Sequence, residues 1–200
     1  MVGIIHYGAG NIFSVLTTVE RYGEKVTIIS KPGLLKKVDR IILPGVGSFD
    51  PGMKFLIDTG LYEEIKDEIK KGKMFLGICL GMQMLFESSE EGKQKGLECI
   101  EGKVQRFPNQ HGLPVPHMGW NSVNITGNSE IFNNIPDGSF FYFAHSFYPV
   151  VKNKKMVIGQ TEYGIKFASC VQKDNIIGVQ FHPEKSGKYG LLFIQNYLKL

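Results

Sequence analysis

Cysteine, tryptophan and long apolar runs are scarce in this sequence of 200 residues. It contains three cysteines and one tryptophan. No two cysteines form a CxxC pair, and a sparse, odd set without an export signal indicates reduced thiols rather than a disulfide framework. No apolar run approaches the ~20 residues of a membrane span, and the N-terminus lacks the pattern of a signal peptide. We therefore expect a cytoplasmic protein.

Binding motifs for metals, nucleotides and nucleic acids are also missing. The five histidines show neither HExxH nor another ligand spacing. The net charge is +4, but the lysines are scattered and no arginine-rich stripe contains aromatic residues, which argues against nucleic acid. There is no GxxxxGK[ST] motif. In "YGAGN" the third glycine position of a dinucleotide loop is Phe13, and Ser30 stands where an acid is expected. We expect no cofactor and no metal.

The first half of the sequence alternates short apolar runs with amphipathic stretches. The runs at 2–7, 25–29, 40–45 and 73–78 predict buried strands. Helical periodicity follows the first run and recurs at 61–72, and a further helix is expected at 80–88. This alternation predicts a parallel sheet with helices on both faces.

From about Gly96 the pattern changes to short strand-like runs separated by polar turns, and a helical stretch at 189–198 closes the chain. No linker, repeat or low-complexity segment separates the two halves. We therefore expect one α/β domain over residues 1–200, with a mixed, mainly parallel central sheet.

Cys79 stands at the predicted boundary between a buried strand and a helix. In "GICLG" small residues lie two positions before and two positions after it, as in a nucleophile elbow. Such a turn exposes the side chain at the carboxyl end of the strand, near a helix N-terminus that favours a thiolate. A buried structural cysteine is the alternative. For Cys99 and Cys170, which lack this context, the structural interpretation is preferred.

A nucleophilic thiol needs a base, and the base needs an orienting group. In "GVQFHPEKSG" a predicted strand runs into His182, which is followed by a proline and by Glu184. A residue before proline favours extended backbone, and alternate side chains then share one face. Glu184 can thus hold the imidazole in one tautomer. Together with Cys79, these residues predict a Cys-His-Glu triad.

Acyl transfer also needs donors for the developing oxyanion. The backbone N–H of Leu80, directly after the nucleophile, is one candidate. The glycine-rich loop "LPGVGSF" at 43–49 supplies the second, from the N–H of Val46 or Gly47. Taken alone, this loop is better explained as a plain strand-to-helix turn.

Three motifs, "LPGVGSF", "GICLGMQ" and "GVQFHPEKSG", occur in the same order as in the triad-type glutamine amidotransferases, and the chain resembles this family from its first strand to its last helix. The resemblance implies a flavodoxin-like fold and hydrolysis of glutamine to glutamate and ammonia. "YGAGN" and "PHMGWN" are similar to the branch that serves imidazole glycerol phosphate synthase in histidine biosynthesis.

The family resemblance also implies roles for individual residues. Cys79 would be the nucleophile, His182 the base and Glu184 its orienting group. Gln83 and Glu87 would face the glutamine from the elbow helix. The segment "AHSF" would grip the α-amino-acid end of the substrate by its backbone, through His145, Ser146 and Phe147.

The expected chemistry is covalent. The Cys79 thiolate attacks the amide carbon of glutamine, the imidazolium of His182 protonates the leaving ammonia, and water hydrolyses the γ-glutamyl thioester. Nothing in the sequence binds an acceptor for the ammonia. The resemblance implies that a (β/α)₈-barrel cyclase subunit receives it, in a heterodimer.

Trp120, the single tryptophan, lies in a segment stiffened by two prolines. Burial in the core is the ordinary interpretation of a tryptophan. Tryptophan and methionine are also enriched at interfaces, and the resemblance favours a docking role. "YGAGN" is expected at the same sheet edge as Cys79. The predicted docking face comprises Asn11, His117, Met118 and Trp120.

Two other functions remain open at this point. The same triad chemistry would serve a cysteine peptidase or a γ-glutamyl hydrolase. A ligand-binding module without enzymatic activity is the third possibility, and it predicts ordinary thiol reactivity for Cys79.

Overall fold

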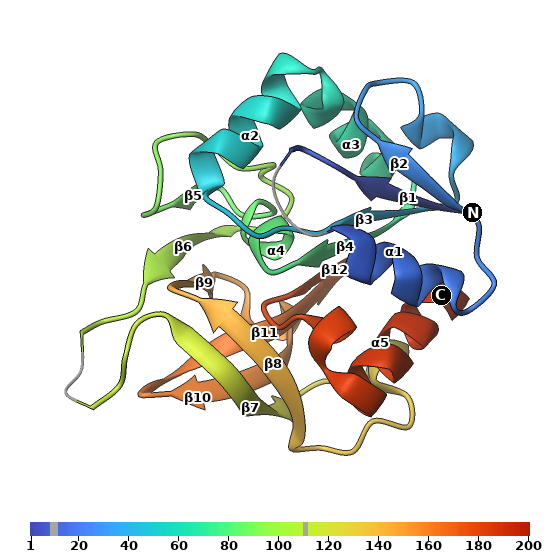
Figure 1. The fold of residues 1–200 in the computed structure, drawn as a ribbon. Coiled ribbons are helices and arrows are strands. Elements are labelled where there is room, and N and C mark those ends of the chain that lie inside the picture. Colours follow the sequence, from blue (N-terminus) through green and yellow to red (C-terminus); the bar gives the residue numbers. More distant parts are fainter. Residues whose placement is uncertain (9–11, 110–111) are drawn as a thin grey trace.

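The first half of the chain alternates strands and helices, as the sequence predicts (Figure 1). The structure is a computed structural model that describes residues 1–8, 12–109 and 112–200. In the first half the elements are β1 (Val2–Ile5), α1 (Ile12–Glu20), β2 (Val26–Ile29), η1 (Leu35–Lys37), β3 (Arg40–Leu43), α2 (Phe49–Asp58), α3 (Leu61–Lys70), β4 (Met74–Ile78) and α4 (Leu80–Gln83).

The second half is dominated by strands until the final helix. Its elements are β5 (Ser88–Ser89), β6 (Gly102–Arg106), β7 (His117–Ile125), η2 (Glu130–Phe132), β8 (Ser139–His145), β9 (Phe147–Val151), η3 (Lys154–Met156), β10 (Val157–Tyr163), β11 (Ile165–Lys173), β12 (Ile176–Val179), η4 (Pro183–Lys185) and α5 (Gly187–Lys199). One of the strand-like runs of the second half, at 139–147, is divided into β8 and the start of β9, since Ser146 separates them.

One large mixed sheet organises the described residues. Its strand order is β2-β1-β3-β4-β12-β11-β10-β7-β8. The first five strands pair in parallel, and the pairs from β12 to β8 are antiparallel. A second sheet has the order β5-β6-β9. The mixed α/β fold predicted from the sequence is confirmed. No helix in the described ranges is both long and apolar enough to cross a membrane.

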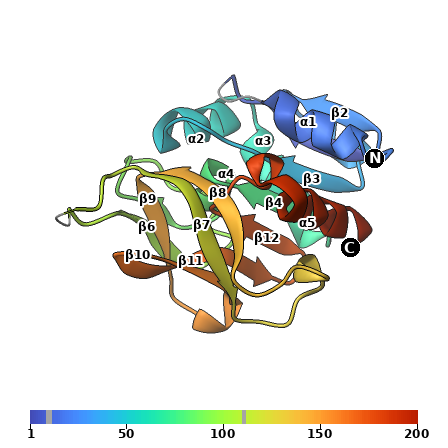
Figure 2. The same cartoon turned by 60° about the horizontal axis from the view of Figure 1, so that its bottom comes forward.

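Helices cover both faces of the parallel strands, with α2 and α3 on one side and α1 and α5 on the other (Figures 1 and 2). Alternate side chains of a strand point to opposite faces. In β3, Ile41 and Leu43 accordingly join the apolar core under α2 and α3, whereas Ile42 joins the core under α1 and α5. Burial on both faces explains why these strands read as continuous apolar runs.

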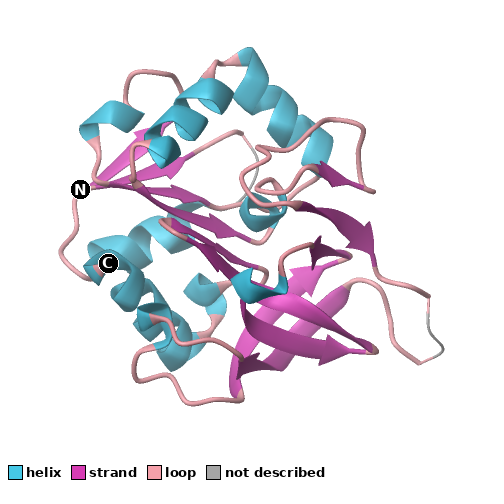
Figure 3. Cartoon of the chain, turned by 180° about the vertical axis from the view of Figure 1, so that it is seen from behind, coloured by secondary structure: helices cyan, strands magenta, loops and turns pink. Residues whose placement is uncertain are grey.

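The helix predicted over residues 80–88 is wrong in its length. The helix α4 ends at Gln83, and the N–H groups of Leu85 and Phe86 then make shorter, three-residue turns. The N–H of Glu87 donates to the carbonyl of Gly102 at 3.1 Å, because the chain here turns toward β5 and β6. Viewed from behind, α4 is a single short coil near the centre of the molecule (Figure 3). Gln83 and Glu87 therefore do not share a helix face.

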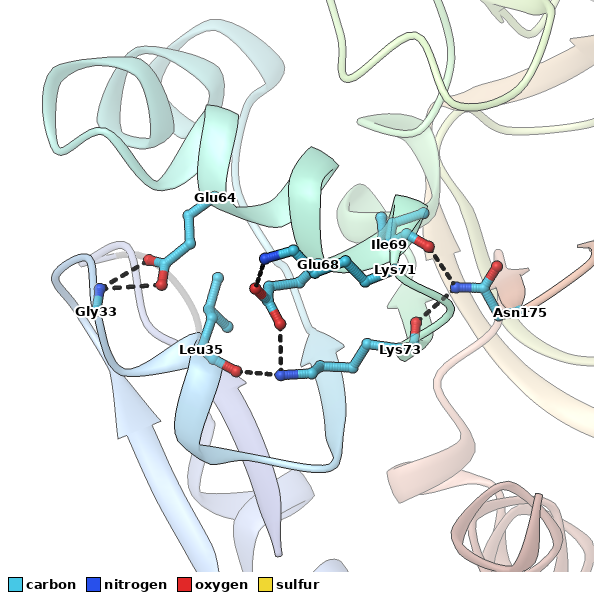
Figure 4. A network of polar contacts seen from close by, with 8 residues as sticks. All are labelled: Gly33, Leu35, Glu64, Glu68, Ile69, Lys71, Lys73 and Asn175. Carbon is cyan, nitrogen blue, oxygen red and sulfur yellow. Dashed lines mark hydrogen bonds and ion pairs between the residues drawn. The ribbon is translucent and has the colours of Figure 1, made fainter.

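Polar side chains of α3 bind the loop after β2 and the turn that leads into β4 (Figure 4). Glu68 is 4% exposed, and its two carboxylate oxygens lie 2.7 Å from the ammonium groups of Lys71 and Lys73. Lys73 also donates to the carbonyl of Leu35. These lysine contacts hold the pKa of Glu68 below its usual value. Stability linked to this carboxylate is therefore present above the unfolded pKa and is lost as the pH falls.

We expect Glu68→Gln to lower the free energy of unfolding by about 1 to 3 kcal/mol at neutral pH, because two lysines lose their charged acceptor. The difference from wild type should shrink well below pH 4.5, the ordinary pKa of glutamate, because the carboxylate is protonated there. Urea unfolding at both pH values measures this. Glu64→Gln on the same helix is the matched control, because Glu64 accepts from the Gly33 N–H instead. A loss that does not vary with pH would contradict the prediction.

Candidate active site

Cys79 occupies a sharp turn between β4 and α4. Its backbone dihedrals are φ 52° and ψ −107°, which is strained for a residue with a side chain. The flanking glycines permit the turn. A Cβ atom on Gly81 would collide with the carbonyl of Leu43, and one on Gly77 would collide with the backbone of Gly81. The geometry is that of the elbow predicted from "GICLG", with the sulfur at the carboxyl end of a central strand.

His182 follows β12, the strand beside β4, and Glu184 lies in the short turn η4. The backbone of His182 is extended, as predicted for a residue before proline. His182 Nδ1 lies 2.8 Å from Glu184 Oε1. The N–H of His182 also donates to the carbonyl of Tyr142 at 2.8 Å, which fixes the residue against β8. The sequence predicted this histidine–carboxylate contact, although Glu184 reaches it from a 3₁₀ turn rather than from an extended strand.

The electrostatics of His182 favour its protonated form. Burial alone would lower its pKa, but the neighbouring Cys79 and the Glu184 carboxylate outweigh this effect and raise the pKa to about 10. His182 Nε2 is buried and has no hydrogen-bond partner among the described residues. Cys79 is nonetheless close enough to raise the pKa of the imidazole.

A cavity of about 270 Å³ opens beside Cys79. It is lined by residues of the elbow, of the loop after β3, and of the segment around β8 and β9. The lining residues are Val46, Gly47, Cys79, Leu80, Gln83, Glu91, Pro116, Met118, Ala144, His145, Ser146 and Phe147. The structure thus brings together the predicted oxyanion residues and four of the five predicted substrate residues.

Glu87 is the predicted substrate residue that the structure places elsewhere. It is exposed, it does not line the cavity, and its Oε2 accepts a hydrogen bond from the Gly102 N–H at 2.9 Å. The reason is the early end of α4. Glu91, which sequence reasoning missed, lines the cavity instead, and its carboxylate accepts from the Phe49 N–H at 3.0 Å. Burial raises the pKa of Glu91.

The predicted oxyanion donor Leu80 is already engaged. Its N–H donates to the carbonyl oxygen of Gly45 at an N···O distance of 3.4 Å. Gly45 must be glycine here, because a Cβ atom would collide with the hydroxyl of Tyr7. On the other side of Val46, Gly47 has a φ of 122°. In this conformation a carbonyl oxygen of the loop occupies the Leu80 N–H, which the prediction requires to be a free donor.

His117 and His145 form a buried pair, which corrects the prediction that His117 lies on a docking face. They are 3% and 5% exposed, and His117 Nδ1 is 3.1 Å from His145 Nε2. Burial lowers the pKa of His117 to about 4 and that of His145 to about 3, so both are neutral. In contrast, Met118 and Trp120 of the same strand are 64% and 55% exposed. Trp120 is therefore not a core residue, and Asn11 lies outside the described residues.

Among the residues that the structure describes, no group of three histidine, cysteine or acidic side chains could hold a metal ion. The cavity is lined by the Cys79 thiol, the Gln83 amide, the Glu91 carboxylate, the His145 imidazole and backbone groups.

Comparison with known proteins identifies the family. The model of the glutamine amidotransferase class-I family matches residues 4–198. The chain therefore belongs to this family.

Two of the most similar relatives are subunits of the same enzyme. The imidazole glycerol phosphate synthase subunit HisH of Methanocaldococcus jannaschii is 47% identical over 203 residues, which cover 100% of both chains. The subunit HisH of Moorella thermoacetica is 44% identical over 200 residues, covering 100% of this chain and 94% of that protein.

Solved structures agree on the fold. PurLQS from Thermotoga maritima superimposes with a TM-score of 0.78 at 20% identity, covering 99% of this chain and 97% of the other. A crystal structure described as a glutamine amidotransferase gives a TM-score of 0.74 at 19% identity, with coverage of 99% and 97%. At these identities the likeness concerns the fold alone.

Proposed function

We propose that this chain is the glutamine-hydrolysing subunit of an imidazole glycerol phosphate synthase, in the cytoplasm, and that Cys79, His182 and Glu184 are its catalytic triad. The observation that carries the proposal is the strained elbow cysteine in the lining of a cavity, near a histidine held by a carboxylate at 2.8 Å. The full-length similarity to HisH subunits supports the choice of substrate and pathway.

The proposed reaction forms and then hydrolyses a thioester. A Cys79 thiolate attacks the side-chain amide carbon of glutamine, and the carbonyl electrons move to the oxygen. The imidazolium of His182 donates its proton to the leaving nitrogen as the C–N bond breaks, which releases ammonia. Neutral His182 then removes a proton from water, which attacks the thioester and releases glutamate. Glu184 stabilises the charged imidazole and fixes its tautomer.

The ammonia requires an acceptor on another protein, and a (β/α)₈-barrel cyclase is the proposed partner. Met118 both lines the cavity and is exposed, so the cavity opens toward the face that carries Trp120. Trp120 stands opposite Tyr142 in the β7–β8 ladder, and its ring meets the Tyr142 ring edge-on. We propose that Met118 and Trp120 form the docking face through which ammonia leaves. His117 is not part of the proposed face, because it is buried.

The choice of substrate distinguishes the proposed reaction from the alternative functions. Free glutamine should yield equal amounts of glutamate and ammonia, whereas internal peptide bonds and γ-glutamyl peptides should be left intact. A glutamine-like electrophile should label Cys79 and not Cys99 or Cys170. Cleavage of peptides in preference to glutamine would indicate a peptidase or γ-glutamyl hydrolase, and indiscriminate thiol labelling would indicate a non-enzymatic module.

Glu184→Gln should reduce kcat by a smaller factor than His182→Ala. In Glu184→Gln the new side chain can still occupy the space beside His182 Nδ1, whereas His182→Ala removes the group that carries the proton. The loss for Glu184→Gln is still expected to reach about a hundredfold or more, because the neutral amide stabilises the imidazolium less and permits the wrong tautomer. Steady-state ammonia release measures both variants. A Glu184→Gln enzyme with wild-type kcat would show that the carboxylate does not orient the base.

A further inference from the structure

A buried amide, Gln180, contacts the sulfur of Cys79 and takes no part in the triad. Its Nε2 lies 3.6 Å from Cys79 Sγ, and its Oε1 lies 3.1 Å from Gln83 Nε2. Gln180 is 0% exposed and Gln83 is 4% exposed. Gln180 directly follows β12 and lies two residues before His182, so the segment after this strand supplies both the base and this amide.

The orientation of the two amides is fixed by a backbone carbonyl. Gln83 Nε2 lies 3.1 Å from the carbonyl oxygen of Phe147, which can only accept. The nitrogen of Gln83 must therefore face Phe147, and it donates its second hydrogen to Gln180. Gln180 must present oxygen to that donor, which leaves its own N–H group facing the sulfur of Cys79. The assignment follows from the network rather than from a choice of amide flip.

We propose that Gln180, anchored through Gln83 to the Phe147 carbonyl, is a positioning residue that donates a hydrogen bond to the Cys79 sulfur and stabilises its thiolate. This inference rests on the proposed role of Cys79 as nucleophile. It adds a residue that the triad does not contain, and it gives Gln83 a second role besides facing the glutamine.

The sulfur has a suitable partner in each protonation state. As a thiol, Cys79 Sγ donates toward the carbonyl of Ala144 at 3.9 Å. As a thiolate it can only accept, and the Gln180 N–H at 3.6 Å is a donor within reach in addition to the His182 imidazolium. Hydrogen bonds to a charged form favour that form, and the effect is strong in a buried site.

The helix after Cys79 is too short to stabilise a thiolate strongly by itself. Long helices favour an anion at their N-terminus through their summed peptide dipoles. The helix α4 has four residues, so its dipole contributes little. Other titratable groups lie around the site, and they come from the loop after β1, the cavity wall, β8, and the turn at His182 and η4. These groups are Tyr7, Glu91, His145, His182 and Glu184.

Alkylation of Cys79 by iodoacetamide as a function of pH tests the proposal, because only the thiolate reacts. Gln180→Met keeps the length of the side chain and removes the N–H. Gln180→Glu keeps an acceptor for Gln83 and places oxygen against the sulfur. Mass spectrometry of the Cys79 peptide separates this thiol from Cys99 and Cys170. Gln172→Glu is the matched control, since Gln172 accepts a hydrogen bond from Ser129 at 2.6 Å and does not line the cavity.

In both Gln180 variants we expect alkylation at neutral pH to slow by about tenfold, and the midpoint of the pH profile to rise, as for the loss of one hydrogen bond to a charged group. The kcat for ammonia release should fall by a similar factor. Gln172→Glu should behave as wild type. Thermal unfolding identifies a Gln180 variant that fails to fold. The alkylation profile of the other Gln180 variant then tests the proposal. A wild-type alkylation profile in either folded variant would overturn the proposal.

The outcome is independent of the test of the triad. If Cys79→Ala retains glutamine hydrolysis, the nucleophile assignment fails, but the alkylation profile still reports whether Gln180 holds the thiolate. If Cys79→Ala is inactive and the Gln180 profiles are unchanged, the triad stands and only this inference fails.

Discussion

Replacing Cys79 with alanine is expected to abolish glutamine hydrolysis while leaving the fold intact. Covalent catalysis has no substitute once its nucleophile is removed, so ammonia release should fall to the background rate of free glutamine. The fold should persist because Cys79 lies at the edge of the cavity and alanine has a similar backbone preference. Both residues carry a Cβ at φ 52°, so the substitution adds no backbone strain.

Ammonia release at saturating glutamine measures the effect, and thermal unfolding checks the fold. The other two thiols provide matched controls. Cys99 is half-buried and Cys170 is buried on β11, and neither lines the cavity. Cys99→Ala and Cys170→Ala should therefore retain hydrolysis. Substantial ammonia release by folded Cys79→Ala would remove this residue from the mechanism.

The contacts between motifs could be predicted from the sequence because each rests on local rules. Glycines around Cys79 permit one kind of turn, and proline after His182 forces extended backbone. Parallel strands then bring both residues to the same sheet edge, so the proximity of Cys79, His182 and Glu184 follows from topology. The predicted roles of these residues are proposals that the variants above will test.

Positions that depend on tertiary packing could not be predicted. The segment after Gln83 has helical periodicity, but Phe86 enters the core and the chain pairs with β6, so Glu87 leaves the site. The helix α2 was missed, because Pro51 and Gly52 weaken its helical pattern. His117 and Trp120 lie on one strand, and only the completed sheet shows which face each side chain takes.

The position of Gln180 in the sequence already indicates a special role. A polar residue in the run "IIGVQF", otherwise apolar, would be buried, and a buried amide requires partners. That observation alone marks Gln180 as unusual. It does not identify Cys79 as the partner, since this depends on the register of β12 beside β4.

The state of the oxyanion loop leads to the last prediction, which concerns the partner. The Leu80 N–H is bound to the Gly45 carbonyl at 3.4 Å. The carbonyl and the following N–H of a peptide point in opposite directions. Rotation of the peptide between Gly45 and Val46 would therefore free the Leu80 N–H and also turn the Val46 N–H toward the cavity. Val46 is 42% exposed, so the loop is accessible to a partner that stabilises the rotated form.

We expect the isolated chain to hydrolyse glutamine slowly, and the (β/α)₈-barrel cyclase with its nucleotide substrate to raise kcat by about 10²- to 10³-fold, the usual effect of one oxyanion donor. Ammonia release with and without the cyclase measures this. Trp120→Ala should raise the cyclase concentration needed for stimulation by more than about tenfold, because buried tryptophans dominate interfaces. Ile57→Ala, which removes an exposed apolar side chain from α2, should not. A chain that is fully active alone would contradict the blocked oxyanion hole, and equal stimulation of Trp120→Ala would place the docking face elsewhere.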